Sequence, residues 1–176
     1  MAIEIRTLWE TRRFSVMEKV VSGAAGSRSR CQYVKHPGSV AILPLVDGEH
    51  VCLIRSRRLT VDETLIEVPA GTREANEVPL ETARRELAEE TGYVAGKFVE
   101  LSSYFPSPGI LSERMHVFVA SELTPGEPAR EENEEIENWV IPLKEAIAMV
   151  DRGEIHDGKT IIALLMYKQR IMDEIR

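Results

Sequence analysis

Three glutamates stand close together at positions 86, 89 and 90. Spacings of three and four residues place side chains on one face of a helix, so Glu86, Glu89 and Glu90 would project together. Carboxylates at this spacing repel one another, and no lysine is interleaved to relieve the repulsion. Clusters of carboxylate oxygens suit hard divalent cations, which keep bound water and bridge to phosphates. The trio therefore indicates either a divalent metal site or an acidic, solvent-facing helix.

A longer pattern around the trio favours the metal site. Gly71, Glu77 and the run Arg85-Glu86-Leu87-Ala88-Glu89-Glu90-Thr91-Gly92-Tyr93 fit G-x5-E-x7-R-E-U-x-E-E-x-G-U, where U is bulky and apolar. This segment resembles the Nudix box, with Tyr93 in place of an aliphatic residue. The resemblance implies that Mg²⁺ or Mn²⁺, as two or more ions, is held by Glu86, Glu89, Glu90 and the carbonyl of Ala70.

Two further positions of the box have physical roles that can be stated in advance. We expect Arg85 to pair with Glu77 or Glu89, which holds the acids in place and reduces their repulsion. We expect Gly71 to let the chain turn tightly before the helix. The resemblance implies hydrolysis of a nucleoside diphosphate linked to another moiety, with cations that neutralise the diphosphate and orient the attacking water.

Segments outside the box resemble the ADP-ribose pyrophosphatase subgroup. Pro108 follows Gly92 by sixteen residues, and the run Arg55-Ser56-Arg57-Arg58 resembles the R-Q-x-R strand end of that subgroup, from which Ser56 and Arg57 depart. By this likeness Arg58 contacts the diphosphate, Glu113 binds the terminal ribose, and Arg30 reaches the adenosine end. An ordinary Pro-Gly turn and surface solvation of the arginines are the alternatives. The substrate-binding residues implied by the resemblance are Arg30, Arg58, Glu67, Gly71, Pro108, Gly109 and Glu113.

A second acidic segment occupies residues 127–137, with six glutamates and one arginine. Family members place a mobile acidic loop here that supplies the base for the attacking water. The resemblance implies that Glu132 is this base and that Glu134 is a further metal ligand, unless the run is only a solvated loop. Since a cation lowers the pKa of bound water, a carboxylate within reach would suffice as the base. The predicted catalytic residues are Glu90, Arg85, Glu132 and Glu134.

The composition fits one compact, globular chain of 176 residues with a formal charge of −7. This acidic total argues against nucleic acid or an anionic membrane as the main partner, because both require clustered Lys and Arg. The apolar runs are too short to span a bilayer, and charged residues stand where a signal peptide needs an apolar stretch. Cys31 and Cys52 lack metal-ligand or redox spacing. We expect a soluble, cytoplasmic protein.

The pattern of turns and apolar runs predicts mostly strands before residue 79 and helices from there onward. Runs rich in Val, Ile and Leu predict strands, the Asp47-Gly48 step predicts a hairpin, and Pro79 and Gly92 mark the start and end of a helix. We expect strands within 4–22, 30–35, 39–46, 50–55, 65–68, 98–102, 115–121 and 137–141, and helices at 79–91, 142–150 and 158–175.

These elements predict an α/β (α+β) fold, a Nudix-type α/β/α sandwich with a mixed central sheet and a small N-terminal antiparallel sheet. The resemblance implies that residues 1–37 form a β segment exchanged across a homodimer and that 38–176 form the Nudix hydrolase domain. Trp9 and Phe14 either stack on adenine or pack in a core.

The leading hypothesis is Mg²⁺-dependent hydrolysis of ADP-ribose to AMP and ribose 5-phosphate. One alternative keeps the hydrolase and changes the nucleotide sugar, for example to ADP-glucose or GDP-mannose. Another is a nucleotide-sensing domain without turnover, although the complete set of Arg85, Glu86, Glu89 and Glu90 weighs against it.

Overall fold

The structure is a computed structural model that describes the chain apart from residues 1, 12–13, 24–26, 131–134 and 175–176. The chain divides into two compact units. The first contains Met1–Gly38 and Tyr104–Met115, and the second contains Ser39–Ser103 and His116–Arg176. The proline-rich segment after residue 103 thus belongs to the same unit as the N-terminal strands, which no sequence pattern indicated.

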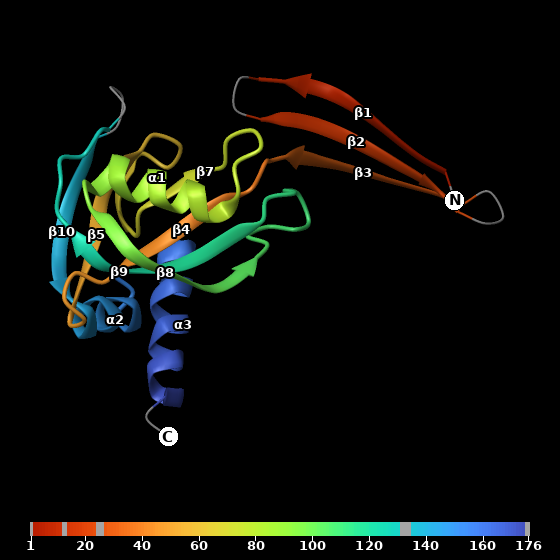
Figure 1. Cartoon of the computed structure of the whole chain (residues 1–176). Coiled ribbons are helices and arrows are strands. Elements are labelled where there is room, and N and C mark those ends of the chain that lie inside the picture. The colour runs from red at the N-terminus through yellow and green to blue at the C-terminus, as the bar shows by residue number, and fades with distance from the viewer. Residues whose placement is uncertain (1, 12–13, 24–26, 131–134, 175–176) are drawn as a thin grey trace. The chain divides into compact units, whose positions relative to one another are not determined.

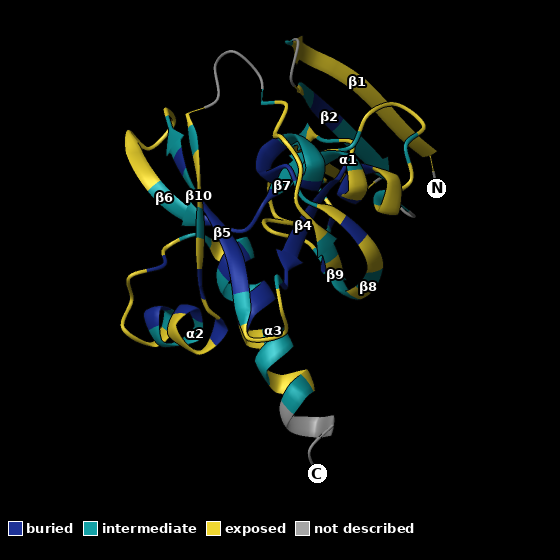
Figure 2. Cartoon of the chain, turned by 60° about the vertical axis from the view of Figure 1, so that its left-hand side comes forward, coloured by how far each residue is buried: buried dark blue, intermediate teal, exposed yellow. Residues whose placement is uncertain are grey.

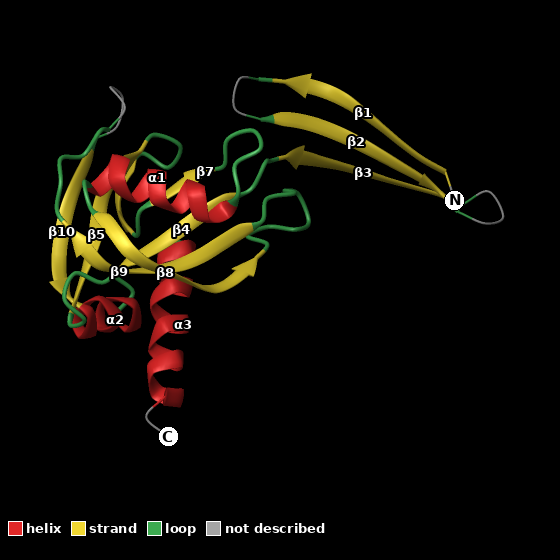
Figure 3. Ribbon diagram, in the orientation of Figure 1, coloured by secondary structure: helices red, strands yellow, loops and turns green. Residues whose placement is uncertain are grey.

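The first unit is built on a three-stranded antiparallel sheet (Figure 3). Its strands are β1 (Ala2–Glu10), β2 (Ser15–Ser22) and β3 (Arg28–Lys35), in the order β1-β2-β3. The expected small N-terminal sheet is thus confirmed, but residues 4–22 form two strands instead of one. They are separated by a turn in which the Thr11 N–H donates to the Phe14 carbonyl at 2.9 Å.

The second unit contains two sheets, with strand orders β10-β5-β6 and β7-β4-β9-β8 (Figure 1). The predicted hairpin turn is present, since the Val46 N–H donates to the His50 carbonyl at 2.9 Å and Gly48 has a φ of +82°. The strands on either side of this turn nevertheless belong to different sheets. The strands are β4 (Ser39–Pro44), β5 (His50–Arg58), β6 (Glu63–Glu67), β7 (Ala70–Thr72), β8 (Val94–Tyr104), β9 (Met115–Thr124) and β10 (Ile136–Pro142).

Three helices complete the second unit: α1 (Pro79–Thr91), α2 (Leu143–Asp151) and α3 (Gly158–Glu174). Both α1 and α3 pack against β4, and Figure 1 shows α1 above this strand and α3 below it. The mixed α+β fold and its mixed sheet agree with the predicted fold class. No helix within the described ranges is long and apolar enough to cross a membrane.

The helix α1 has the predicted bounds because its end signals are local. Proline at the first position tolerates the missing N–H, and Gly92 ends the helix in the left-handed region with a φ of 80°. Leu80, in the first turn of α1, is 39% exposed, whereas Ala83 and Leu87 are buried. The buried side of α1 faces a core that β4, β8 and β9 also supply (Figure 2), formed by Val40, Ile42, Ala83, Leu87, Ala95, Phe118 and Ala120.

Candidate active site

The three glutamates Glu86, Glu89 and Glu90 lie in different environments although they share one face of α1. Glu90 is 4% exposed, and one of its carboxylate oxygens accepts the Ala70 N–H at 2.9 Å. Glu89 has a side chain that is 41% exposed, and Glu86 is half-buried. The helix therefore presents one buried and two more accessible carboxylates.

Arg85 connects the acids of the box to one another. Its Nε and Nη2 atoms donate to the two carboxylate oxygens of Glu77 at 3.0 and 3.1 Å. Its Nη1 atom donates to Glu86 at 2.7 Å and to Glu89 at 3.0 Å, and Nη2 also donates to the Thr72 carbonyl at 3.2 Å. The predicted pairing with Glu77 or Glu89 is confirmed, and it is made with both. The planar guanidinium thus reduces the repulsion between the carboxylates and fixes their directions.

The Arg85–Glu77 pair makes stability dependent on acid pH. Hydrogen bonds from Arg85, the Glu74 N–H and Thr82 lower the pKa of Glu77 from 4.5 to about 2. A depressed carboxyl pKa stabilises the fold above the unfolded value, and this contribution is lost as the pH falls from about 4.5 towards 2. Urea unfolding across this range should show a steeper loss of stability in the unmodified chain than in Glu77→Gln. Parallel curves for the two proteins would contradict this linkage.

Gly71 is required by a close approach, and the expected role in a tight turn is wrong. It lies in β7, where it pairs with Val40 of β4, and its φ lies outside the left-handed region. A Cβ atom at this position would lie 1.8 to 2.3 Å from the carboxylate atoms of Glu86. Only a residue without a side chain leaves this space to the Glu86 carboxylate.

The oxygen donors fit a hard divalent cation, but they are held by internal partners in this structure. Within the described ranges, no three His, Cys, Asp or Glu side chains converge as a ready-made metal cluster. Of the three predicted glutamate ligands on α1, Glu86 and Glu89 pair with Arg85, and Glu90 accepts the Ala70 N–H. The donor set is nevertheless all oxygen, and the space beside Gly71 admits the Glu86 carboxylate to the strand that carries Ala70.

A buried ion network lies at the ends of β5, β6 and α3. Glu67 is 1% exposed, and the Nε and Nη2 atoms of Arg58 donate to its two oxygens at 2.7 Å each. Lys159 pairs with the same carboxylate and with Asp157 at 3.0 Å. Burial alone would raise the pKa of Glu67, but the bonds from Arg58 and Lys159 outweigh it and the pKa is lowered. The predicted diphosphate contact Arg58 is therefore held in place by a carboxylate.

Removal of Lys159 tests this network. Lys159→Met leaves a buried carboxylate with fewer partners, so the free energy of unfolding should fall by about 1–3 kcal/mol. Lys168→Met is the matched control on the same helix. The Lys168 Nζ atom lies 3.8 Å from a carboxylate oxygen of Asp151, and this ion pair is long and exposed to solvent. That exposed pair contributes about 0–1 kcal/mol. Equal denaturant midpoints for the two variants would contradict a stabilising role of Lys159.

Four of the predicted substrate-binding residues belong to the first unit. Arg30 is exposed and lies 3.6 Å from Glu18. Pro108 and Gly109 are exposed within a turn closed by hydrogen bonds to the Ser107 carbonyl. Glu113 lies 3.8 Å from the Nδ1 atom of His36.

The predicted base Glu132 and the predicted metal ligand Glu134 lie outside the described residues. Sequence reasoning did not assign roles to Arg130 and Asn138, which bind the end of α1. It also assigned none to Lys159, which pairs with Glu67, or to Asp157, which binds Lys159 and Thr160. Arg130 carried a usable signal, since it is the one cation in the acidic run 127–137.

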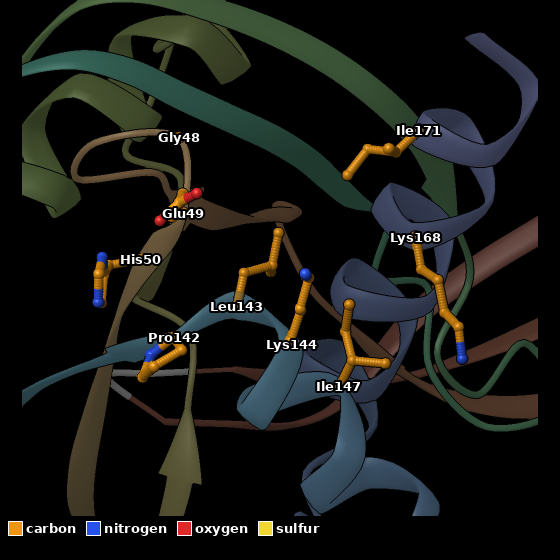
Figure 4. A pocket seen from close by; sticks show the side chains of 9 residues that line it. All are labelled: Gly48, Glu49, His50, Pro142, Leu143, Lys144, Ile147, Lys168 and Ile171. Atoms are coloured by element: carbon orange, nitrogen blue, oxygen red, sulfur yellow. The ribbon is translucent and has the colours of Figure 1, made fainter. Parts of the chain in front are cut away.

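A cavity of about 620 Å³ in the second unit is lined by residues other than those of the candidate site (Figure 4). Its apolar lining comes from Leu143 and Ile147 of α2 and Ile171 of α3. None of the box residues lines it. The polar surface of the box, not this cavity, has the groups suited to phosphate chemistry.

Comparison with known proteins finds similarity over most of the chain. The NUDIX domain matches residues 35–164. The chain is 40% identical over 141 residues to an ADP-ribose pyrophosphatase of Bacillus subtilis (strain 168), an alignment that covers 79% of this chain and 76% of the relative. It is 35% identical over 142 residues to a GDP-mannose pyrophosphatase of Citrobacter koseri (strain ATCC BAA-895 / CDC 4225-83 / SGSC4696), covering 75% and 73%.

A solved structure described as an ADP compounds hydrolase has the same fold, with a TM-score of 0.84 at 23% identity and coverage of 98% of this chain and 95% of that one. The chain belongs to the NUDIX family. It is a hydrolase that acts on pyrophosphate bonds, and Nudix hydrolases generally use divalent metals such as Mg²⁺.

Proposed function

We propose that the protein hydrolyses the diphosphate bond of ADP-ribose to give AMP and ribose 5-phosphate, with Mg²⁺ or Mn²⁺ as two or more ions. The observation that carries the reaction class is the approach of Glu86 to Gly71, beside two further carboxylates held by Arg85 and Ala70. The 40% identity to an ADP-ribose pyrophosphatase supports the choice of substrate.

The proposed metal ligands are Glu86, Glu89, Glu90 and the Ala70 carbonyl, with Glu134 as a further ligand. A bound divalent cation neutralises phosphate charge and lowers the pKa of a coordinated water. The chain contributes the directions of these carboxylates, because Arg85 holds Glu86 and Glu89 while the Ala70 N–H holds Glu90.

The remaining roles concern the substrate and the attacking water. Arg58, fixed by Glu67, presents a planar cation for the diphosphate. We assign Glu113 to the terminal ribose, Arg30 to the adenosine end, and Glu132 to removal of the water proton. The other proposed substrate contacts are Glu67, Gly71, Pro108 and Gly109.

Product analysis tests the proposal. The protein is incubated with Mg²⁺ and ADP-ribose, ADP-glucose or GDP-mannose, and the products are separated by chromatography. We expect AMP and ribose 5-phosphate as the main products, with the highest kcat/KM for ADP-ribose. No turnover of any compound would overturn the hydrolase assignment, whereas preference for GDP-mannose would overturn the substrate alone. The 35% identity to a GDP-mannose pyrophosphatase makes this nucleotide sugar the second candidate.

A homodimer is the proposed assembly, and the exposed apolar residues of β1 support it. The strand exposes Ile3, Ile5 and Trp9, the last at 59%, so Trp9 does not pack in a core of the described chain. An exposed apolar strand of this kind marks an interaction surface. The cytoplasmic location and the absence of a nucleic-acid partner stay predictions.

Sedimentation tests the assembly. The unmodified chain, of 19.8 kDa, should sediment at twice this mass. Ile5→Lys should shift it to the monomer because a charge enters the apolar surface, while Glu4→Lys places the same residue on the opposite side of the strand and should leave the dimer intact. A monomeric unmodified chain would contradict the proposal.

A further inference from the structure

The backbone carbonyls at the C-terminal end of α1 accept hydrogen bonds from residues that lie outside the helix. The last four carbonyls of a helix have no partners within the helix, and in α1 these belong to residues 88–91. The Gly92 N–H donates a hydrogen bond to the Ala88 carbonyl at 2.9 Å. The other three carbonyls accept from a segment about forty residues further along the chain.

Three donors of that segment take the three carbonyls in order. The Ala129 N–H donates to the Glu89 carbonyl at 2.9 Å. Arg130 Nε donates to the Glu90 carbonyl at 2.9 Å, and Asn138 Nδ2 donates to the Thr91 carbonyl at 2.8 Å. These carbonyls belong to, or directly follow, two of the proposed metal ligands.

The two side-chain donors also bind each other. Arg130 Nη2 donates to Asn138 Oδ1 at 2.7 Å. Because the amide oxygen accepts from Arg130, the amide nitrogen is directed to the Thr91 carbonyl. The pair therefore acts as one unit on the helix end.

Backbone contact and charge strengthen this attachment. A Cβ atom at Gly92 would lie 2.3 Å from the Gly126 carbonyl oxygen, so the segment passes directly over the end of the helix. The last turn of α1 contains no basic residue. Arg130 supplies the positive charge that the negative end of a helix dipole favours.

We propose that Arg130 and Asn138 are positioning residues that fix the backbone of residues 89–91 and thereby the proposed metal ligands Glu89 and Glu90. The proposal rests on the metal assignment made above. Glu90 is then held from two sides, at its side chain by the Ala70 N–H and at its carbonyl by Arg130.

Metal affinity without substrate is the decisive measurement, because it does not depend on which substrate is cleaved. Titration of the full chain with Mn²⁺ in a calorimeter should show weaker binding by Arg130→Met, by about tenfold to a hundredfold, as for other residues that orient metal ligands. With Mg²⁺ and ADP-ribose, kcat should fall while KM is unchanged. Arg130→Lys keeps the charge but not the planar fork, so it should restore only part of the affinity.

Arg152→Met is the matched control, since Arg152 follows the last residue of α2 and makes three hydrogen bonds, to Glu145 and Glu154. It should bind Mn²⁺ as the unmodified chain does. If circular dichroism shows that Arg130→Met is unfolded, Asn138→Asp replaces it, because this change puts a carboxylate oxygen in place of the donor to Thr91 and keeps an acceptor for Arg130.

The outcomes separate the inference from the proposed function. Mn²⁺ affinity in the folded variant equal to that of Arg152→Met overturns the positioning role. If the unmodified chain binds Mn²⁺ but cleaves no compound of the panel, the proposed function is overturned. The Mn²⁺ affinities of Arg130→Met and Arg152→Met then still decide whether Arg130 is a positioning residue. An unmodified chain that binds no Mn²⁺ overturns the metal assignment and this inference together.

Discussion

Glu90→Gln is expected to reduce turnover by at least a hundredfold to a thousandfold while the protein remains folded. Glu90 is 4% exposed, and its carboxylate accepts the Ala70 N–H at 2.9 Å. The amide oxygen of glutamine can accept the same hydrogen bond, so the packing between α1 and β7 is kept. The substitution removes the negative charge, however, and a cation contributes several kcal/mol to the transition state when its ligands are intact. Each 1.36 kcal/mol corresponds to about tenfold in rate.

The control for this variant is Glu81→Gln, the same chemical change in the exposed first turn of the same helix. Steady-state rates with Mg²⁺ and ADP-ribose, together with thermal unfolding, should be measured for both proteins. We expect Glu81→Gln to retain full activity, since glutamine also suits the third position of a helix start. Activity of Glu90→Gln equal to that of Glu81→Gln would refute the role of Glu90 as a metal ligand.

Local signals account for the parts of the fold that sequence reasoning predicted well. The bounds of α1 follow from Pro79 and Gly92, whose effects on the backbone do not depend on distant residues. The glutamate face follows from helical periodicity, and the pairing of Arg85 with Glu89 follows from their i, i+4 spacing on the helix.

Features that depend on long-range contacts could not be predicted in this way. Arg130 meets the Glu90 carbonyl across forty residues of sequence, and Lys159 meets Glu67 across ninety-two. The sequence separation in these two pairs follows no helical or strand period. The contacts form only because the intervening strands bring the residues together. Gly71 is a further example. The motif showed that a glycine is expected at this position, but the physical need for it comes from a tertiary contact, the approach of the Glu86 carboxylate.

Gly71→Ala is expected to reduce kcat by about a hundredfold, although it adds a single methyl group. The new Cβ atom would lie 1.8 to 2.3 Å from the carboxylate atoms of Glu86, closer than any real contact of this kind. The backbone of β7 is held by its pairing with β4, so the side chain of Glu86 must move. A misplacement of about 1 Å can cost about a hundredfold in rate when a group must be aligned for reaction. Since the Glu86 carboxylate also accepts from Arg85 at 2.7 Å, its movement disturbs the neighbouring acids as well.

Gly158→Ala is the matched control, because a Cβ atom there meets nothing within 4 Å and the residue begins α3 without a left-handed φ. Both variants should be compared with the unmodified chain for kcat, for Mn²⁺ affinity and for thermal unfolding. We expect Gly71→Ala to lose metal affinity together with rate, whereas Gly158→Ala should keep both. Because the carboxylate lies at the end of a side chain that can rotate away, the fold should tolerate the methyl group better than the chemistry does. Gly71→Ala with the rate and metal affinity of Gly158→Ala would show that the position of Glu86 beside this glycine is not needed for catalysis.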